Sequence, residues 1–261
     1  MRTTFRLLQG TFKALYYNFD VFLRLCWAWF LILIALASAV MAFIGSKGDP
    51  ELTSAATIVV ILIALVANAS IAVSWHRCLL MDEMPGTTHL KIGAREWAYL
   101  GRAVLVGVIA FAMMFAISFI VHSFGAIADG AEANAMLVLT VLTGAAAVFL
   151  IVPAVLRLSL ILPAGAVDRP LGMRDAWRMS RSLGYPMLFA MFGIAIVMGL
   201  AQEILDALLD LVSFQWFLGV YYVLKSGILL VALQILSLAL TIGILTGGYK
   251  IMLERVDPAR S

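Results

Sequence analysis

The sequence predicts an all-α, polytopic membrane protein with six transmembrane helices. Hydrophobic residues make up 64% of the 261 residues, against roughly 45–50% in soluble domains. Apolar stretches long enough to cross a hydrocarbon layer of about 30 Å recur along the chain. A helix satisfies its own backbone hydrogen bonds in lipid, and the alternation typical of membrane β-strands is missing from the sequence.

The predicted spans differ in length and in the residues that interrupt them. The fifth is the shortest and begins beside Pro186. The fourth contains Pro153, which should kink the helix because proline lacks a backbone donor. After the fifth span, Glu203, Asp206 and Asp210 recur at helical spacing, which predicts a separate amphipathic helix on the outer face. The six spans are expected near residues 25–45, 55–75, 103–121, 135–156, 186–202 and 227–248.

The distribution of positive charge predicts the orientation of the chain. Of the 18 Lys and Arg residues, all except Lys47 and Lys225 fall near the termini or in the connections that follow even-numbered spans. Cytoplasmic connections carry an excess of Lys and Arg. We therefore expect both termini in the cytoplasm and the chain in a bacterial inner membrane.

The chain is expected to form a single membrane domain, 1–261, with three similar units at 1–85, 86–165 and 166–261. Each unit would begin with an interfacial helix and continue into a hairpin of two spans. In the first unit, Phe5, Leu8 and Phe12 lie opposite a cationic stripe, a pattern typical of a helix in the membrane interface. Chance similarity among apolar helices with basic ends is the alternative. The cationic stripes are Arg2, Arg6 and Lys13, then Lys91, Arg95 and Arg102, then Arg174, Arg178 and Arg181.

The third cationic stripe is the strongest candidate for binding anionic lipid headgroups. Arg174, Arg178 and Arg181 recur at i, i+4 and i+7, so a helix would present all three on one face. Trp177 would be a flanking anchor at the headgroup level. A loop whose positive charge only sets the orientation of the chain is the alternative for every arginine. Two further candidates, at the cytoplasmic ends of spans where long cationic side chains reach headgroups, are Arg157 and Arg77.

Few polar groups stand within the predicted spans. Asn68, Thr140 and Gln234 are the ones that could line an intramembrane polar path, and hydrogen bonds between helices are the alternative. Gly243 and Gly247 form a GxxxG pair, which is typical of close helix packing.

Motifs for catalysis and for metal binding are missing from the sequence. It contains no HExxH, no GxSxG and no Gly-rich nucleotide loop. Its three His and two Cys are scattered rather than spaced as metal ligands. The acidic pairs Asp82–Glu83 and Asp168–Asp175 are expected to compensate nearby cations. We therefore expect no enzymatic activity, no cofactor, no metal and no nucleic-acid partner.

The stretch after the fourth span resembles a known family. An arginine-ended span, then Leu162–Pro163 with a run of small residues, then Ala176–Trp177–Arg178, is similar to six-helix bacterial inner-membrane proteins. It also resembles the membrane domain attached to some glycerophosphodiester phosphodiesterases. The resemblance implies an integral inner-membrane protein without the soluble catalytic barrel of those enzymes. It transfers no catalytic residue to this chain.

Two hypotheses for the function follow. In the first, the protein is a non-enzymatic component that organises anionic lipid or docks on a larger membrane assembly, with lipids and possible membrane proteins as partners. In the second, it is a transporter or flippase for a small or amphiphilic solute. Convergence of Asn68, Thr140 and Gln234 on one cavity would favour transport.

Overall fold

The computed structural model describes residues 1–47, 50–127, 133–211 and 218–256. Every regular element among these residues is helical, and six segments are long and apolar enough to cross a membrane. The predicted all-α class with six spans is confirmed. The elements are α1 (Arg2–Tyr17), α2 (Phe19–Lys47), α3 (Pro50–Met81), α4 (Ala94–Ile127), α5 (Ala133–Ala146), η1 (Ala147–Ile151), α6 (Val152–Leu158), α7 (Ile161–Ala166), α8 (Met173–Met179), α9 (Gly184–Leu211) and α10 (Leu218–Val256).

The fourth span is interrupted where the sequence predicts it. The π-helical turn η1 ends at Ile151 and is followed directly by α6, which begins at Val152 and has Pro153 in its first turn. Proline cannot donate a backbone hydrogen bond, and π-bulges and prolines are the usual causes of kinks. The departure from α-helical geometry therefore lies beside Pro153.

The fifth span is longer than predicted, and the prediction of a separate amphipathic helix on the outer face is wrong. Helix α9 runs without a break from Gly184 to Leu211, so Glu203 and Asp206 lie on its last turns. The sequence between Ala201 and Leu211 contains good helix formers and no proline, so nothing ends the helix where its apolar run ends. The hydropathy change marks the end of the apolar surface, not the end of the helix.

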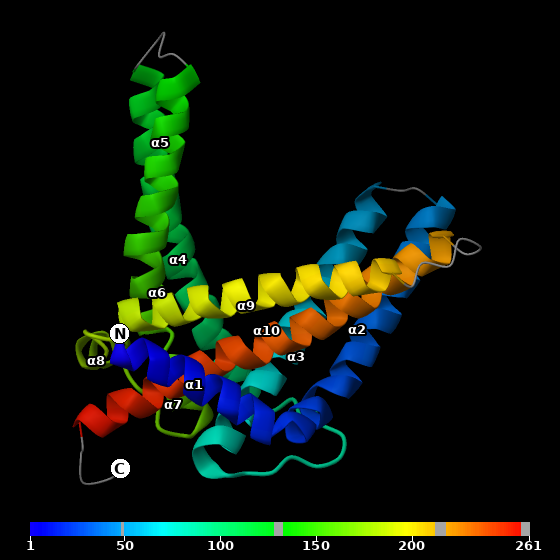
Figure 1. The fold of residues 1–261 in the computed structure, drawn as a ribbon, viewed down its shortest axis with the longest axis horizontal. Helices are drawn as coiled ribbons and strands as arrows, with labels where there is room; N and C mark the ends of the chain where they lie inside the picture. Colours follow the sequence, from blue (N-terminus) through cyan, green and yellow to red (C-terminus); the bar gives the residue numbers. More distant parts are fainter. Residues whose placement is uncertain (48–49, 128–132, 212–217, 257–261) are drawn as a thin grey trace.

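Burial is concentrated at one end of the molecule. In α3, every residue from Ala69 to Val73 is buried, whereas Leu62 is exposed. In α10, among residues 233–256, whose exposure the structure describes, the buried ones lie between Ala239 and Met252. Figure 1 shows the helices diverging from this end, with α4 and α5 pointing away from α9 and α10. We call this end the base, and it comprises α1, residues 21–29 of α2, residues 67–81 of α3, residues 94–106 of α4, α6, α7, α8, the first turns of α9 and residues 239–256 of α10.

Helix α1 closes the base by packing across the last hairpin. Figure 1 shows it beside α9 and α10, and these are its main contacts. It buries Leu7, Thr11 and Leu15, which share one face. Arg6 joins α1 to the end of α10 through an ion pair with Glu254 at 2.8 Å. A helix therefore forms where the sequence predicts one. It packs on the protein through Leu7, Thr11 and Leu15, whereas Phe5 of the stripe expected to meet lipid is exposed and Leu8 and Phe12 are half-buried.

The GxxxG pair of α10, Gly243 and Gly247, packs against α1 rather than against another span. A Cβ atom at Gly243 would lie 2.6 Å from Cγ2 of Thr11. A Cβ atom at Gly247 would lie 3.1 Å from Cδ2 of Leu7. The two glycines thus provide the close approach of α1 to α10.

The elements that precede the second and third hairpins also differ from the predicted interfacial helices. In the second unit, Lys91 lies in the loop before α4, and Arg95 and Arg102 belong to the first turns of α4 itself. In the third, α8 has only seven residues. Arg181 follows α8, in turns that connect it to α9.

Candidate functional site

Three of the exposed arginines of the base lie on and directly after α8. Arg174, Arg178 and Arg181 are all exposed, and none forms an ion pair with another residue in the described parts of the chain. The prediction that one helix carries all three is wrong, because α8 ends at Met179. Ser180 ends it: its hydroxyl donates to the Ala176 carbonyl, and serine competes in this way with helical backbone bonding. The three cations therefore lie on one short segment but not on one helical face.

Arg157 is occupied within the protein. Its Cζ lies 3.7 Å from the centroid of the Trp177 ring, a cation–π distance. One of its nitrogens also donates to the Trp177 carbonyl, and Nε donates to Ser180 at 3.4 Å. Arg157 therefore holds α6 to α8, while the exposed part of Trp177 can still face the membrane.

Arg77 is also occupied, at the centre of an ion-pair cluster. Its guanidinium donates to Glu83 at 2.6 Å, to Asp168 at 2.8 Å and to the carbonyl of Ala166 at 3.1 Å. Arg95 donates to both carboxylate oxygens of Asp168 at 2.9 Å. Hydrogen bonds from these arginines lower the pKa of Glu83 and the pKa of Asp168. Glu83 and Asp168 compensate cations as the sequence predicts, and Arg77 has no free donor face for a headgroup.

The loop before α4 is fastened along α3 beside this cluster. The Ser70 hydroxyl donates to the carbonyl of Lys91 at 2.6 Å, and Ser74 Oγ lies 2.7 Å from Nε2 of His89. Trp27 of α2 donates to the carbonyl of Thr87 at 3.1 Å. A polar cavity of about 200 Å³ remains between the loop, α3 and the first turn of α4. Because the serine bonds are spaced one turn apart along α3, we interpret the Ser74–His89 contact as part of this fastening.

Acidification should loosen this loop. Burial is the main cause that lowers the pKa of His89 below its ordinary 6.5, and Lys91 adds to the effect while Glu96 opposes it. The unfolded loop therefore binds more protons below pH 6.5, and the stability that neutral His89 contributes is lost as the pH falls below that value. Glu83 and Asp168 have lowered pKa values, so they stay ionised over the same range.

We expect amide hydrogen exchange in residues 82–93, corrected for intrinsic rates, to increase between pH 7.5 and pH 5.5. Replacing His89 with Gln should remove this pH dependence, because Gln does not titrate. An equal increase in the variant would assign the effect to another group.

The base also buries a chain of polar side chains that the sequence does not reveal. His76 Nδ1 lies 2.8 Å from the Thr246 hydroxyl, which itself donates to the Ile242 carbonyl. His76 therefore donates through Nδ1, and Nε2 accepts from the Tyr99 hydroxyl at 3.4 Å. The chain joins α3, α4 and α10 in the middle of the base. A lone histidine in an apolar segment carries no sequence signal for partners this distant.

The three residues predicted to line a polar path do not converge on one cavity. Asn68 donates to the carbonyl of Ala64 on its own helix at 2.8 Å. Thr140 lies on α5 and Gln234 on α10, both at exposed positions. None of the three residues lines any of the cavities described here.

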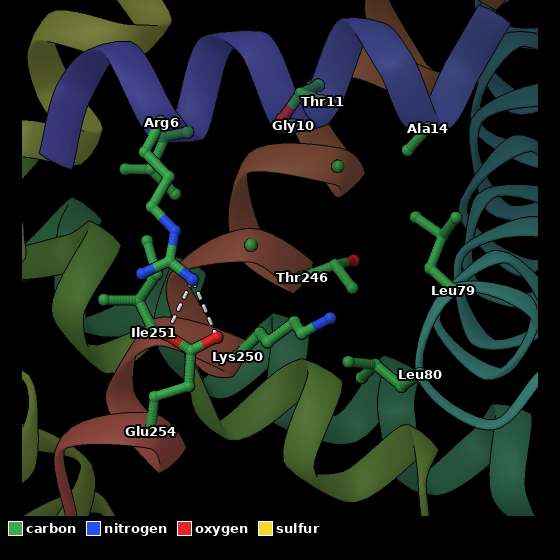
Figure 2. Close-up of a pocket in the computed structure, with 13 residues that line it drawn as sticks. Arg6, Gly10, Thr11, Ala14, Leu79, Leu80, Thr246, Lys250, Ile251 and Glu254 are labelled. Carbon is green, nitrogen blue, oxygen red and sulfur yellow. Dashed lines mark hydrogen bonds and ion pairs between the residues drawn. The ribbon is translucent and has the colours of Figure 1, made fainter. Parts of the chain in front are cut away.

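The base also contains a cavity of about 260 Å³ between α1, the end of α3 and the end of α10 (Figure 2). Arg6 lies on one side of the cavity and Leu79 and Leu80 on the other, with the Lys250 side chain between them. The sequence does not predict it, because its walls come from three segments far apart in the chain.

No protein-family model, curated protein or solved structure matches this chain. The family resemblance drawn from the sequence stays a prediction. Among the residues that the structure describes, no three His, Cys, Asp or Glu side chains are grouped closely enough to hold a metal ion.

Proposed function

We propose that this multi-pass membrane protein is a non-enzymatic component of a bacterial inner membrane that organises anionic lipid at its base. The base would face the cytoplasm. The observation that supports this proposal is a division among the arginines. Arg77, Arg95 and Arg157 are engaged by protein groups. Arg174, Arg178 and Arg181 stay exposed on one short segment of the base, without ion pairs among the described residues.

The expected strength of this interaction suits lipid retention rather than anchoring. A cation near an anionic membrane surface contributes about 1 kcal/mol, so three contribute roughly 3 kcal/mol before the cost of ordering the side chains. The six spans already hold the protein in the membrane. The arginines would therefore select which lipids stay beside the base.

Transport has less support from this geometry. The residues expected to line a path lie on three different helices, and Asn68 bonds within its own helix. Docking on a larger assembly stays a prediction from the sequence.

Replacing Arg174, Arg178 and Arg181 together with Gln should lower the amount of co-purifying anionic lipid severalfold, because three exposed charges are lost. Native mass spectrometry of the purified protein measures this. Replacing all three with Lys should largely preserve retention, since the charge is kept. Unchanged retention in the Gln variant would leave these arginines with no role beyond setting the orientation of the chain.

A further inference from the structure

The cavity between α1, α3 and α10 is amphipathic. Figure 2 shows α1 along one side of it, with Arg6 reaching down to Glu254. Leu7, Leu79 and Ile251 contribute apolar walls. Its volume of about 260 Å³ lies just below the range of about 300–1,000 Å³ typical of ligand pockets. A polar headgroup with the first atoms of its chains fits this size better than a whole lipid does.

The charge of the cavity favours an anion. The ion pair with Glu254 compensates Arg6. Lys250 is exposed, lies across the cavity toward Leu79 and Leu80 in Figure 2, and forms no ion pair within the described part of the chain. The lining thus carries one excess positive charge. Arg6 and Lys250 both line the cavity.

A glycine of α1, Gly10, lies in the wall of the cavity. Gly10 lies in the middle of α1, where glycine costs about 1 kcal/mol relative to alanine. A Cβ atom there would meet nothing within 4 Å, whereas close contacts with α1 account for Gly243 and Gly247. Gly10 is exposed and lines the cavity, so a large side chain at this position would enter open space beside it.

The polar lining completes the site. Thr11, buried between α1 and α10, has a hydroxyl without a hydrogen-bond partner among the described residues. Thr246 lines the same cavity, and its hydroxyl orientation is fixed by His76 and the Ile242 carbonyl. The proton of the Thr246 hydroxyl is committed to the Ile242 carbonyl, so Thr11 is the one of the two threonines whose hydroxyl could donate to a ligand oxygen.

We propose that this cavity is a discrete binding site for one phosphate-bearing anion, with Lys250 and Arg6 as its charged ligands. The apolar walls favour the headgroup of an anionic phospholipid as the source of the phosphate, and in that respect the inference rests on the proposed function. The site differs from Arg174, Arg178 and Arg181, because it is a partly open cavity lined by three helices, with apolar as well as charged side chains.

The test is native mass spectrometry of the full chain in detergent with added phosphatidylglycerol, phosphatidylcholine or glycerol 3-phosphate. We expect one tightly bound phosphatidylglycerol per chain. Lys250→Gln should weaken its binding about fivefold, the effect of one charge near 1 kcal/mol. Gly10→Phe should abolish it by filling the cavity. Gly10→Ala is the matched control, because it adds helix propensity with little volume and should keep the bound lipid.

The outcomes separate this site from the proposed function. Loss of the tight lipid in Lys250→Gln and Gly10→Phe, but not in the triple Gln variant of the arginines, supports a discrete site. Equal binding of glycerol 3-phosphate and phosphatidylglycerol would support the phosphate site and assign it to a soluble ligand. Unchanged phosphatidylglycerol binding in both cavity variants would overturn the inference, whether or not the arginine variant loses lipid. Circular dichroism shows whether Gly10→Phe is folded, and Lys250→Gln, at an exposed position, tests the site independently.

Discussion

Replacing Trp75 with Ala is expected to lower the free energy of unfolding by about 3–5 kcal/mol, the range for large aromatic side chains removed from a core. Trp75 is 1% exposed and packs edge-on against the fully buried Phe22, with ring centroids 4.9 Å apart. The contact joins α3 to α2 in the most densely buried part of the molecule. Unfolding in SDS, followed by circular dichroism, measures the change.

Two matched variants test whether packing is the cause. Trp75→Phe should cost less than about 1.5 kcal/mol, because it keeps an aromatic ring and removes an indole N–H that has no partner among the described residues. Trp97→Ala should change stability little, since Trp97 is 56% exposed. Similar losses for Trp75→Ala and Trp97→Ala would show that Trp75 does not hold the base together.

The number and approximate position of the spans could be predicted because partition into lipid is a local property. A window of apolar residues reports it without any knowledge of neighbours. The ends of α9 could not be predicted in this way. Its continuous apolar run ends at Ala201 and acidic residues begin at Glu203, but helix propensity continues to Leu211. Hydropathy reports where the apolar residues lie, and it does not report where the helical backbone ends.

The partner of an amphipathic helix is not encoded locally. The apolar stripe of α1 would look the same whether it met lipid or protein. The structure buries Leu7, Thr11 and Leu15 and leaves Phe5 exposed. The signal that α1 meets protein lies far away, in Gly243 and Gly247 of α10. Only the two segments together specify the contact.

The same limit applies to the arginines. Arg77 and Arg174 are both cations at the predicted cytoplasmic face, and sequence reasoning treats them alike. Arg77 is engaged because Asp168, 91 residues further along the chain, folds back onto it. Sequence predicts the side of the membrane on which a cation lies, since that depends on the topology of the spans. It does not predict which cations the fold leaves free.

Glycines provide a sharper test of which contacts the fold requires, and α9 carries a matched pair. At Gly184, a Cβ atom would lie 2.9 Å from the carbonyl oxygen of Pro153 and 3.1 Å from Cδ of Arg157. At Gly199, on the same helix, a Cβ atom would meet nothing within 4 Å. Alanine is a better helix former than glycine at both positions. At Gly184 the steric contact should outweigh this gain in helix propensity, whereas at Gly199 nothing opposes it. The two substitutions should therefore change stability in opposite directions.

Gly184→Ala should lower the free energy of unfolding by about 1–3 kcal/mol, the cost of overpacking, because a backbone carbonyl cannot turn aside as a side-chain end can. The displaced α9 would also press on Arg157, which holds Trp177 by its cation–π contact. Gly199→Ala should raise the free energy of unfolding by up to about 1 kcal/mol. Parallel SDS titrations, with tryptophan fluorescence as a second signal for the Arg157–Trp177 contact, measure both effects. If Gly184→Ala stabilises the protein as much as Gly199→Ala does, α6 and α9 do not pack as closely at Gly184 as the structure shows. The contact of Gly184 with Arg157 would then be contradicted as well.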